Sequence, residues 1–212
     1  KACSSPAGKD IFTFDAKAQV LDEKARRLFH TTVAKLLYLT KRARPDIMTA
    51  IGFLCTRVTK ATTQDRKKLR RMLGYLKGTV EWILTLRRDD WKRLEAFIDA
   101  AFAAHHDAKS HTGVALFLGK ALVYAASRKQ KCVTKSPTDS ELVGLTDNIQ
   151  FVELFAEFLS FITNTPVQVP LIYQDCTAVI SLVTECGGVV RTKHLRVRME
   201  LCKEGLDQQR FE

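Results

Sequence analysis

The stretch "LEAFIDAAFA", residues 94–103, places Asp99 among apolar side chains. The density of apolar residues predicts a buried β-strand in which this acid is the exception. A lone carboxylate in apolar surroundings costs several kcal/mol unless it is paired, protonated or bound to a metal ion. We therefore expect Asp99 to be buried beside a partner that compensates its charge.

The residues after this strand predict the rest of an α/β domain. Two further strands, "HTGVALFLG" (111–119) and "ALVYAAS" (121–127), are joined by a short turn at Gly119-Lys120. They are followed by a long amphipathic helix from about Thr138 to Thr163, a buried strand "VPLIYQD" (169–175), a short helix around 178–182, a break at Gly187-Gly188 and a last helix "TKHLRVRMELCKEG" (192–205). This order predicts a mixed β-sheet flanked by helices.

Residues 1–92 are basic and have a helical pattern. They hold 21 Lys and Arg against 9 Asp and Glu, a net charge of +12, whereas residues 93–212 hold 13 against 14, a net charge of −1. This asymmetry favours a polyanion as the partner of the first part, and a solvated cationic surface is the alternative. The linker-like "RRDDWKR" (87–93) predicts a boundary between a basic helical segment, 1–92, and the α/β domain, 93–212.

Three helices are predicted within the basic segment. The first, "EKARRLFHTTVAKLLYLT" (23–40), has an apolar stripe that begins at Leu28, and the second starts after Pro45. The third, in "TTQDRKKLRRMLGYLKG" (62–78), has a Thr cap and ends at Gly78. Its cations either line a phosphate backbone or form a solvated surface; they are Arg66, Lys67, Lys68, Arg70, Arg71 and Lys77.

Composition argues against several classes of protein. No apolar run reaches the ~18–20 residues of a membrane span, and the first residues lack the apolar core of a signal peptide. Six scattered cysteines without zinc-ligand spacing favour reduced thiols in an intracellular protein. The chain does not begin with Met, so we expect a fragment of a longer protein. We expect neither a membrane nor a small-molecule cofactor as a partner.

Three carboxylates occupy related positions in this layout. Asp99 lies in the first strand, Glu141 in the first turns of the long helix, and Asp175 at the carboxyl end of the later strand, where α/β sites form. If these two strands are neighbours, the acids converge and need a counter-charge, for which Mg²⁺ or Mn²⁺ suits oxygen ligands. Two such ions about 3.5–4 Å apart can activate water against a phosphodiester. Taken singly, the alternatives are a strand-end residue, a helix-dipole partner and an N-cap.

Six blocks occur in one order across nearly the whole chain: "HTTVAKLLYLTKRARPDI", "YLKGT", "FIDAAFAAHHDAKSHTG", "SRKQKCVTKSPTDSELVGLTD", "IYQDCTAVISL" and "RTKHLRVRMEL". They resemble the carboxyl-terminal part of copia-type retrotransposon polyproteins, where the end of the reverse transcriptase precedes its ribonuclease H domain. The resemblance implies an RNase H-like fold, two divalent metal ions held by Asp99, Glu141 and Asp175, and cleavage of the RNA strand of RNA–DNA hybrids. Residues 1–92 would correspond to the thumb or connection region.

The order Asp, Glu, Asp favours RNase H within this fold, because related integrases and transposases place the glutamate last. The chain departs from the family at two places. It has "SPTDSE" (136–141) where the family usually has "SSTEAE", and Arg196 where many members have a fourth acid. Glu200, one turn later, is a candidate substitute, and His194 is a candidate for product release or phosphate contact. Asp107 matches a recurrent family acid, which we interpret as a loop-forming residue.

Two functions from different classes follow. The first is metal-dependent endonucleolytic cleavage of hybrids, with an upstream reverse transcriptase polymerase region as partner, in a cytoplasmic particle or the nucleus. The second is a nucleic-acid-binding module that has lost cleavage. No paired-aspartate motif of a polymerase palm is found. Further phosphate contacts are predicted at Lys109, Arg128, Lys129 and Lys131.

Overall fold

The computed structural model describes residues 3–87, 93–184 and 193–212, with side chains from residue 195 onward in the last range. The chain forms two compact units, Lys1–Leu84 and Thr85–Glu212, and each is considered by itself. The predicted boundary at 92–93 adjoins residues 88–92, which lie outside the described part of the chain.

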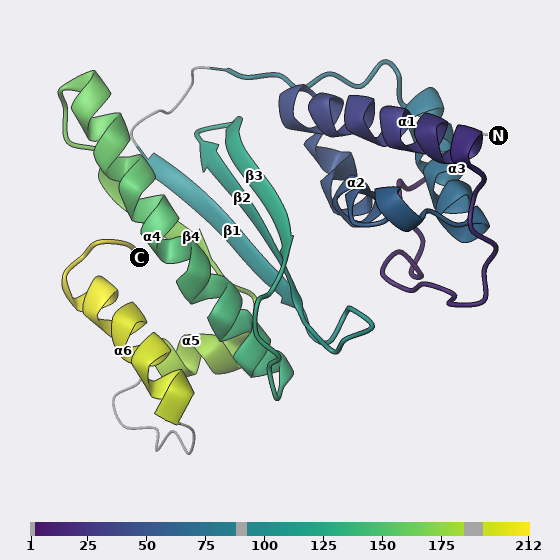
Figure 1. Ribbon diagram of the computed structural model, residues 1–212. Coiled ribbons are helices and arrows are strands. Elements are labelled where there is room, and N and C mark those ends of the chain that lie inside the picture. The colour runs from purple at the N-terminus through teal and green to yellow at the C-terminus, as the bar shows by residue number, and fades with distance from the viewer. Residues whose placement is uncertain (1–2, 88–92, 185–192) are drawn as a thin grey trace. The chain divides into compact units, whose positions relative to one another are not determined.

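The first unit is a small helical domain. It contains α1 (Glu23–Arg42), α2 (Met48–Cys55) and α3 (Thr63–Gly78), with 3₁₀ turns at Pro45–Ile47 and Val58–Lys60 (Figure 1). Its core is made of aliphatic and aromatic side chains of all three helices, among them Phe29, Val33, Ile51, Leu54 and Met72. The predicted apolar stripe of the first helix is wrong at Leu28. This residue precedes the buried Phe29 by one position, which turns its side chain away from the core and leaves it 69% exposed.

The ends of α3 follow the local chemistry of the sequence. The Thr62 hydroxyl accepts a hydrogen bond from the Asp65 N–H, and the Asp65 carboxylate accepts one from the Thr62 N–H. This capping box satisfies two backbone donors that the first helical turn leaves without partners. The helix ends at Gly78, as predicted.

The second unit is built on one mixed sheet. Its strands are β1 (Arg93–Ala101), β2 (His111–Leu118), β3 (Ala121–Lys129) and β4 (Gln168–Tyr173), in the order β3-β2-β1-β4. The first strand pairs antiparallel with β2 and parallel with β4. Gly119, in the β2–β3 turn, has a φ of 57°, which glycine adopts without strain. The predicted adjacency of the first and fourth strands is confirmed.

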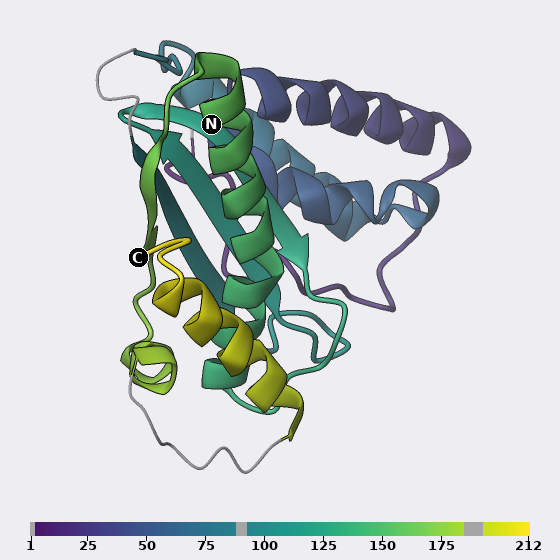
Figure 2. The same ribbon diagram turned by 90° about the vertical axis from the view of Figure 1, so that its left-hand side faces the viewer.

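Three helices accompany this sheet: α4 (Pro137–Thr163), α5 (Thr177–Thr184) and α6 (Lys193–Asp207). Figures 1 and 2 show α4 along one face of the sheet, with α6 beside it. The predicted α/β fold class, a mixed sheet flanked by helices after a basic helical segment, is confirmed. The predicted break at Gly187-Gly188 lies outside the described residues.

The contact between α4 and the sheet depends on a glycine. Leu142, Ile149 and Val152 of this helix are buried against the strands. A Cβ atom at Gly144 would lie 3.2 Å from the Thr112 side chain and 3.4 Å from the Ala100 Cβ. The helix therefore approaches β1 and β2 as closely as a residue without a side chain allows, one turn after Glu141.

The prediction that Asp99 is buried is wrong. Successive side chains of a strand point to opposite faces, and Ile98 and Ala100 take the buried face beneath α4. Asp99 shares the other face with Phe97, and both are exposed. On that face the Phe97 ring stacks on the Tyr173 ring, with centroids 4.4 Å apart.

None of the described helices combines the length and the apolar composition needed to cross a membrane.

Candidate functional site

Three carboxylates meet where β1, α4 and the chain after β4 come together. Asp99 is the seventh residue of β1, Glu141 lies in the second turn of α4, and Asp175 follows β4 by two residues. Each offers one oxygen atom, and these three atoms lie within 4.8 Å of one another. The parallel pairing of β1 with β4 brings Asp99 and Asp175 together, and the close approach of α4 adds Glu141.

Glu141 is the buried member of this group, whereas Asp99 and Asp175 are exposed. Its Oε1 accepts a hydrogen bond from the Ala100 N–H at 3.1 Å. Burial raises the pKa of Glu141 to about 7, and the nearby charges of Asp99 and Asp175 add to this effect. Within the described part of the chain, no Lys or Arg forms an ion pair with the three carboxylates. Among the described residues, hydrogen bonds from the Ala100 N–H and the Gln174 amide to Glu141 are therefore the contacts that offset their mutual repulsion, without a cationic side chain.

The donor set fits a hard divalent cation. Carboxylate oxygens are the preferred ligands of Mg²⁺ and Mn²⁺. Oxygen atoms on opposite sides of one Mg²⁺ ion lie about 4.2 Å apart, twice the metal–oxygen bond length. The observed span of 4.8 Å is close to this value.

Gln174 is a residue of this site that the sequence did not reveal. Its Nε2 donates a hydrogen bond to Glu141 Oε2 at 3.4 Å, and its Oε1 accepts one from the Cys176 N–H at 3.0 Å. The amide thus links the end of β4 to the buried carboxylate. Only its position beside Asp175 could have indicated this role, and a polar residue next to an acid is too common to be a signal.

The raised pKa of Glu141 predicts a pH-dependent stability of the metal-free protein. Because the folded state binds this proton more tightly than the unfolded state, the stabilisation is complete below pH 4.5 and is lost as pH rises through about 7. We expect the free energy of unfolding to fall by on the order of 1–3 kcal/mol across this range. Urea denaturation in EDTA at several pH values measures it.

Glu141→Gln is the matched variant for this measurement, since a neutral amide has no proton to lose. We expect the decrease in stability between pH 4.5 and about 7 to shrink in this variant. An equal decrease in the variant and the natural chain would show that another group causes it.

The structure separates the remaining catalytic candidates from this group. Glu200 lies on α6, is exposed, and its Oε1 is 3.9 Å from the Arg196 guanidinium. It is not part of the carboxylate group. His194 belongs to α6, but its side chain lies outside the described part of the structure. Asp107 pairs with Lys129 at 2.6 Å, which ties the β1–β2 loop to the end of β3.

The predicted cations of α3 are exposed, with one exception. Arg66, Lys67, Arg70, Arg71 and Lys77 point to solvent. Lys68 is only 8% exposed, and its ammonium donates hydrogen bonds to the backbone carbonyls of Ile11 and Thr13. The prediction that Lys68 is a nucleic-acid contact is wrong, because this position faces the N-terminal segment that packs on the helix. Burial lowers the pKa of Lys68.

Replacing Lys68 with Ala is expected to destabilise the first unit by about 1–3 kcal/mol, because two carbonyls lose their donor. Lys67→Ala is the matched control. It removes an exposed charge and should leave the free energy of unfolding unchanged within about 0.5 kcal/mol. Chemical denaturation of both variants measures the difference, and equal stabilities would contradict the structural role of Lys68.

Four predicted phosphate contacts belong to the second unit. Arg128, Lys129 and Lys131 are exposed at and beyond the end of β3, whereas Lys109 is half-buried in the β1–β2 loop. Lys129 is held by Asp107. These cations and those of α3 therefore lie in different units of the chain.

The order β-β-β-α-β-α-α, with β4 parallel to β1 and three carboxylates near that pair, agrees with the arrangement that the resemblance to ribonuclease H domains implies. Homologues of the chain are retrovirus-related Pol polyproteins from transposons. That of transposon TNT 1-94 from Nicotiana tabacum is 26% identical over 182 residues, which are 85% of this chain and 14% of the relative. The uncharacterized mitochondrial protein AtMg00810 from Arabidopsis thaliana is 33% identical over 114 residues, 53% of this chain and 47% of that protein.

The chain thus spans less than half the length of these relatives. No known family model matches it. Among solved structures, the chain is similar to LC11-RNase H1, which was isolated from compost by a metagenomic approach. The alignment covers 55% of this chain and 78% of the LC11-RNase H1 chain. The TM-score is 0.39 and the sequence identity 8%, a level of similarity that by itself assigns no activity.

Proposed function

We propose that the chain is the ribonuclease H part of a retrotransposon reverse transcriptase, a metal-dependent endonuclease that hydrolyses the RNA strand of RNA–DNA hybrids. The observation that carries this proposal is the group of Asp99, Glu141 and Asp175, whose oxygens lie within 4.8 Å without a described counter-cation. A cluster of like charges that the protein does not neutralise is expected to recruit cations. Homology to Pol polyproteins supports the nucleic-acid context.

Each carboxylate has a distinct part in this proposal. The exposed Asp99 and Asp175 present their oxygens to solvent and hold the metal ions. Glu141, anchored by the Ala100 N–H and the Gln174 amide, completes the coordination and orients the attacking water. Bound Mg²⁺ or Mn²⁺, with two ions expected, supplies an activated water and charge neutralisation at the leaving oxygen. The fixed positions of the three side chains account for most of the protein's contribution.

The substrate follows from the charge of the chain. A net charge of +11 favours a polyanion, and the exposed cations of α3 and of the end of β3 supply phosphate contacts. Hybrids differ from DNA in the 2′-hydroxyls of one strand and in groove shape, which a protein recognises without reading base sequence. An upstream polymerase region would deliver the hybrid, and an intracellular location agrees with that role.

A cleavage assay on an end-labelled RNA–DNA hybrid tests the proposal. We expect cuts in the RNA strand with Mg²⁺ or Mn²⁺, 3′-hydroxyl products, and no cuts with EDTA. A DNA duplex of the same sequence is the matched control and should stay intact. An intact hybrid under every metal condition would overturn the nuclease proposal.

A second function is favoured by one observation. Arg196 occupies the position of the usual fourth acid, and Glu200 lies outside the carboxylate group. A chain with only three acids in place would then bind hybrids without cutting them. Salt-dependent hybrid affinity combined with an intact RNA strand would establish this binding module as the function.

A further inference from the structure

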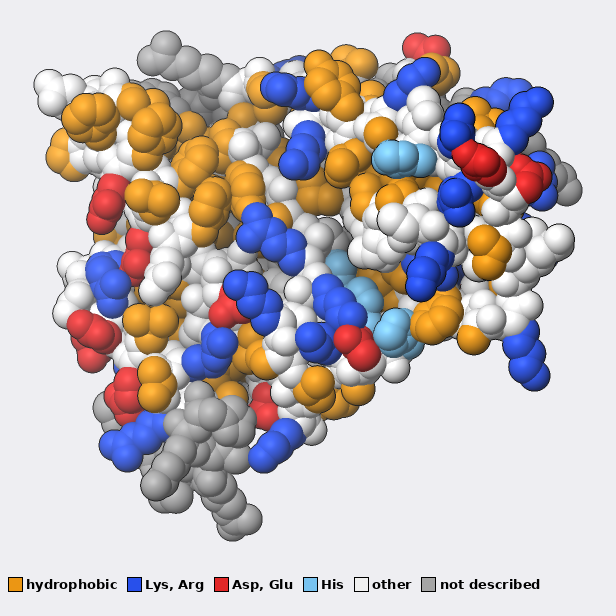
Figure 3. Space-filling model, viewed as in Figure 1, with side chains coloured by type: hydrophobic (Ala, Val, Ile, Leu, Met, Phe, Trp, Pro, Cys, Tyr) orange, Lys and Arg blue, Asp and Glu red, His pale blue; other side chains and the backbone are white. Residues whose placement is uncertain are grey.

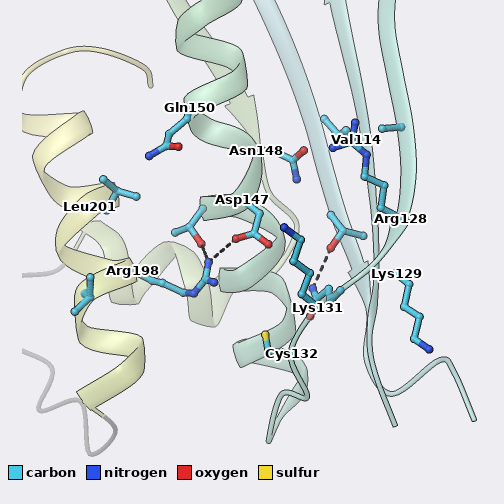
Figure 4. A pocket seen from close by; sticks show the side chains of 15 residues that line it. Val114, Arg128, Lys129, Lys131, Cys132, Asp147, Asn148, Gln150, Arg198 and Leu201 are labelled. Atoms are coloured by element: carbon cyan, nitrogen blue, oxygen red, sulfur yellow. Dashed lines mark hydrogen bonds and ion pairs between the residues drawn. The ribbon is translucent and has the colours of Figure 1, made fainter. Parts of the chain in front are cut away.

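A groove lies on the second unit between β2 and β3 on one side and α4 and α6 on the other. Its volume is about 690 Å³. In Figure 4, Arg128 and Lys129 line it from β3, Asp147 and Asn148 from α4, and Arg198 from α6. Figure 3 shows Lys and Arg side chains gathered on this face. The groove is distinct from the carboxylate group, none of whose members lines it.

The groove has a surplus of positive charge. Arg198 is committed to α4, because its guanidinium donates to Asp147 at 2.8 Å and to the Thr146 hydroxyl. Lys129 is likewise paired with Asp107. Arg128 donates to a neutral group, the Tyr124 hydroxyl. Among the described residues, neither Arg128 nor Lys131 forms an ion pair. Two cations on the β3 side are therefore available for an anionic ligand.

Hydrogen bonds hold one of the residues that line the groove, Gln130, in a defined position. Gln130 is buried, and its Nε2 donates to the Thr112 hydroxyl at 2.9 Å and to the Ser140 carbonyl at 2.8 Å. These bonds join β2, the end of β3 and the residue before Glu141. A ligand in the groove thus meets a preformed surface, which lowers the ordering cost of binding.

The separation between the groove and the carboxylates follows from the positions of Asn148 and Glu141 on α4. Asn148 lies seven residues after Glu141 on α4, which is two helical turns and about 10.5 Å along the helix axis. Both residues therefore lie on the same side of the helix. At about 3.4 Å per nucleotide along one strand, this separation corresponds to about three nucleotides.

We infer that this groove binds one or two nucleotides of a single nucleic-acid strand through their phosphates. A volume of about 690 Å³ is in the range of small-ligand sites and does not admit a duplex. Arg128 and Lys131 hold the phosphates, Arg128 with the planar donor pair that matches two phosphate oxygens. The exposed Gln150 offers its amide group to sugar or base, whereas the Asn148 amide is buried and donates to the Gly144 carbonyl at 2.7 Å. The inference rests on the proposed function only in taking nucleic acid as the ligand.

Cys132 provides a local measurement of occupancy. Its exposed side chain lines the groove, so a bound strand should slow its alkylation by iodoacetamide. Mass spectrometry measures the rate of this alkylation. With a 5′-phosphorylated oligothymidylate and no divalent metal, we expect at least a fivefold slower reaction at Cys132. Cys3, in the other unit, is the internal reference. Unchanged reactivity of Cys132, or protection only by a duplex, would overturn the inference.

Charge variants make the test specific. Arg128→Gln combined with Lys131→Gln should remove the protection and reduce the salt slope of oligonucleotide binding by about 2. Lys203→Gln, on α6 but outside the groove, should change neither. Circular dichroism confirms that the variants fold. If the oligothymidylate still protects Cys132 in the double variant, the inference is contradicted. If the natural chain shows normal protection of Cys132 but does not cleave the hybrid, only the nuclease proposal is contradicted.

Discussion

Replacing Asp99 with Asn is expected to lower the rate of hybrid cleavage by at least about a thousandfold while hybrid affinity is kept or increased. The amide has the size of the carboxylate but no charge, so metal-ion coordination loses several kcal/mol of transition-state stabilisation. Asp99 is exposed, so the substitution leaves the core intact. Removing one negative charge also reduces repulsion between the site and the phosphates.

Asp207→Asn is the matched control for this experiment. It makes the same chemical change on an exposed residue of α6, outside the carboxylate group, and should cleave at the rate of the natural chain. Single-turnover cleavage rates and hybrid dissociation constants, measured for both variants at one salt concentration, separate chemistry from binding. If Asp99→Asn cleaves as fast as Asp207→Asn, the carboxylate group is not the catalytic centre.

Replacing Gly144 with Leu is expected to destabilise the second unit by about 1–3 kcal/mol and to weaken Mn²⁺ binding at least tenfold. The Cβ alone would lie 3.2 Å from Thr112 and 3.4 Å from Ala100, so a larger side chain forces α4 away from the sheet. Glu141 lies one turn earlier and accepts the Ala100 N–H. Moving the helix therefore withdraws the buried carboxylate from the other two.

Gly113→Leu controls for the change of residue type in the stability measurement alone, because a Cβ at Gly113 meets nothing within 4 Å, whereas Gly113 pairs with Asp99 across β1 and β2 and is unsuited as a control for Mn²⁺ binding. This variant should keep the stability of the natural chain, which urea denaturation measures. Gly144→Ala should fall between the two, since gained helix propensity offsets the tight contact. Calorimetric titration with Mn²⁺ completes the comparison. Undiminished Mn²⁺ affinity in Gly144→Leu would show that close helix packing does not assemble the site.

Local features were predictable because they depend on neighbours in the chain. Thr62 and Asp65 specify the start of α3 through their own hydrogen bonds, and Gly119 specifies the β2–β3 turn through its backbone freedom. The start of α4 was predicted to within one residue: the helix begins at Pro137, not Thr138, because its first position donates no hydrogen bond within the helix and so accepts a proline. These elements needed no knowledge of the fold.

Burial was predicted less well because it depends on what covers each face. Lys68 occupies a helical position that looks like the exposed positions beside it, and only the packing of the N-terminal segment on α3 buries it. Asp99 stands in an apolar run, yet strand alternation turns it away from α4. In both cases residues distant in sequence decide the environment.

The sequence by itself determined the order of strands and helices, the asymmetry of charge, and which three acids are candidates for one site. Only the tertiary structure decided that Glu141, and not Asp99, is the buried carboxylate with a pKa of about 7. It also decided that Gln174 contacts Glu141 and that cations from β3 border a groove beside α4. The physical reason is that side-chain type and spacing fix local conformation, whereas solvent exclusion is set by surfaces that meet after folding.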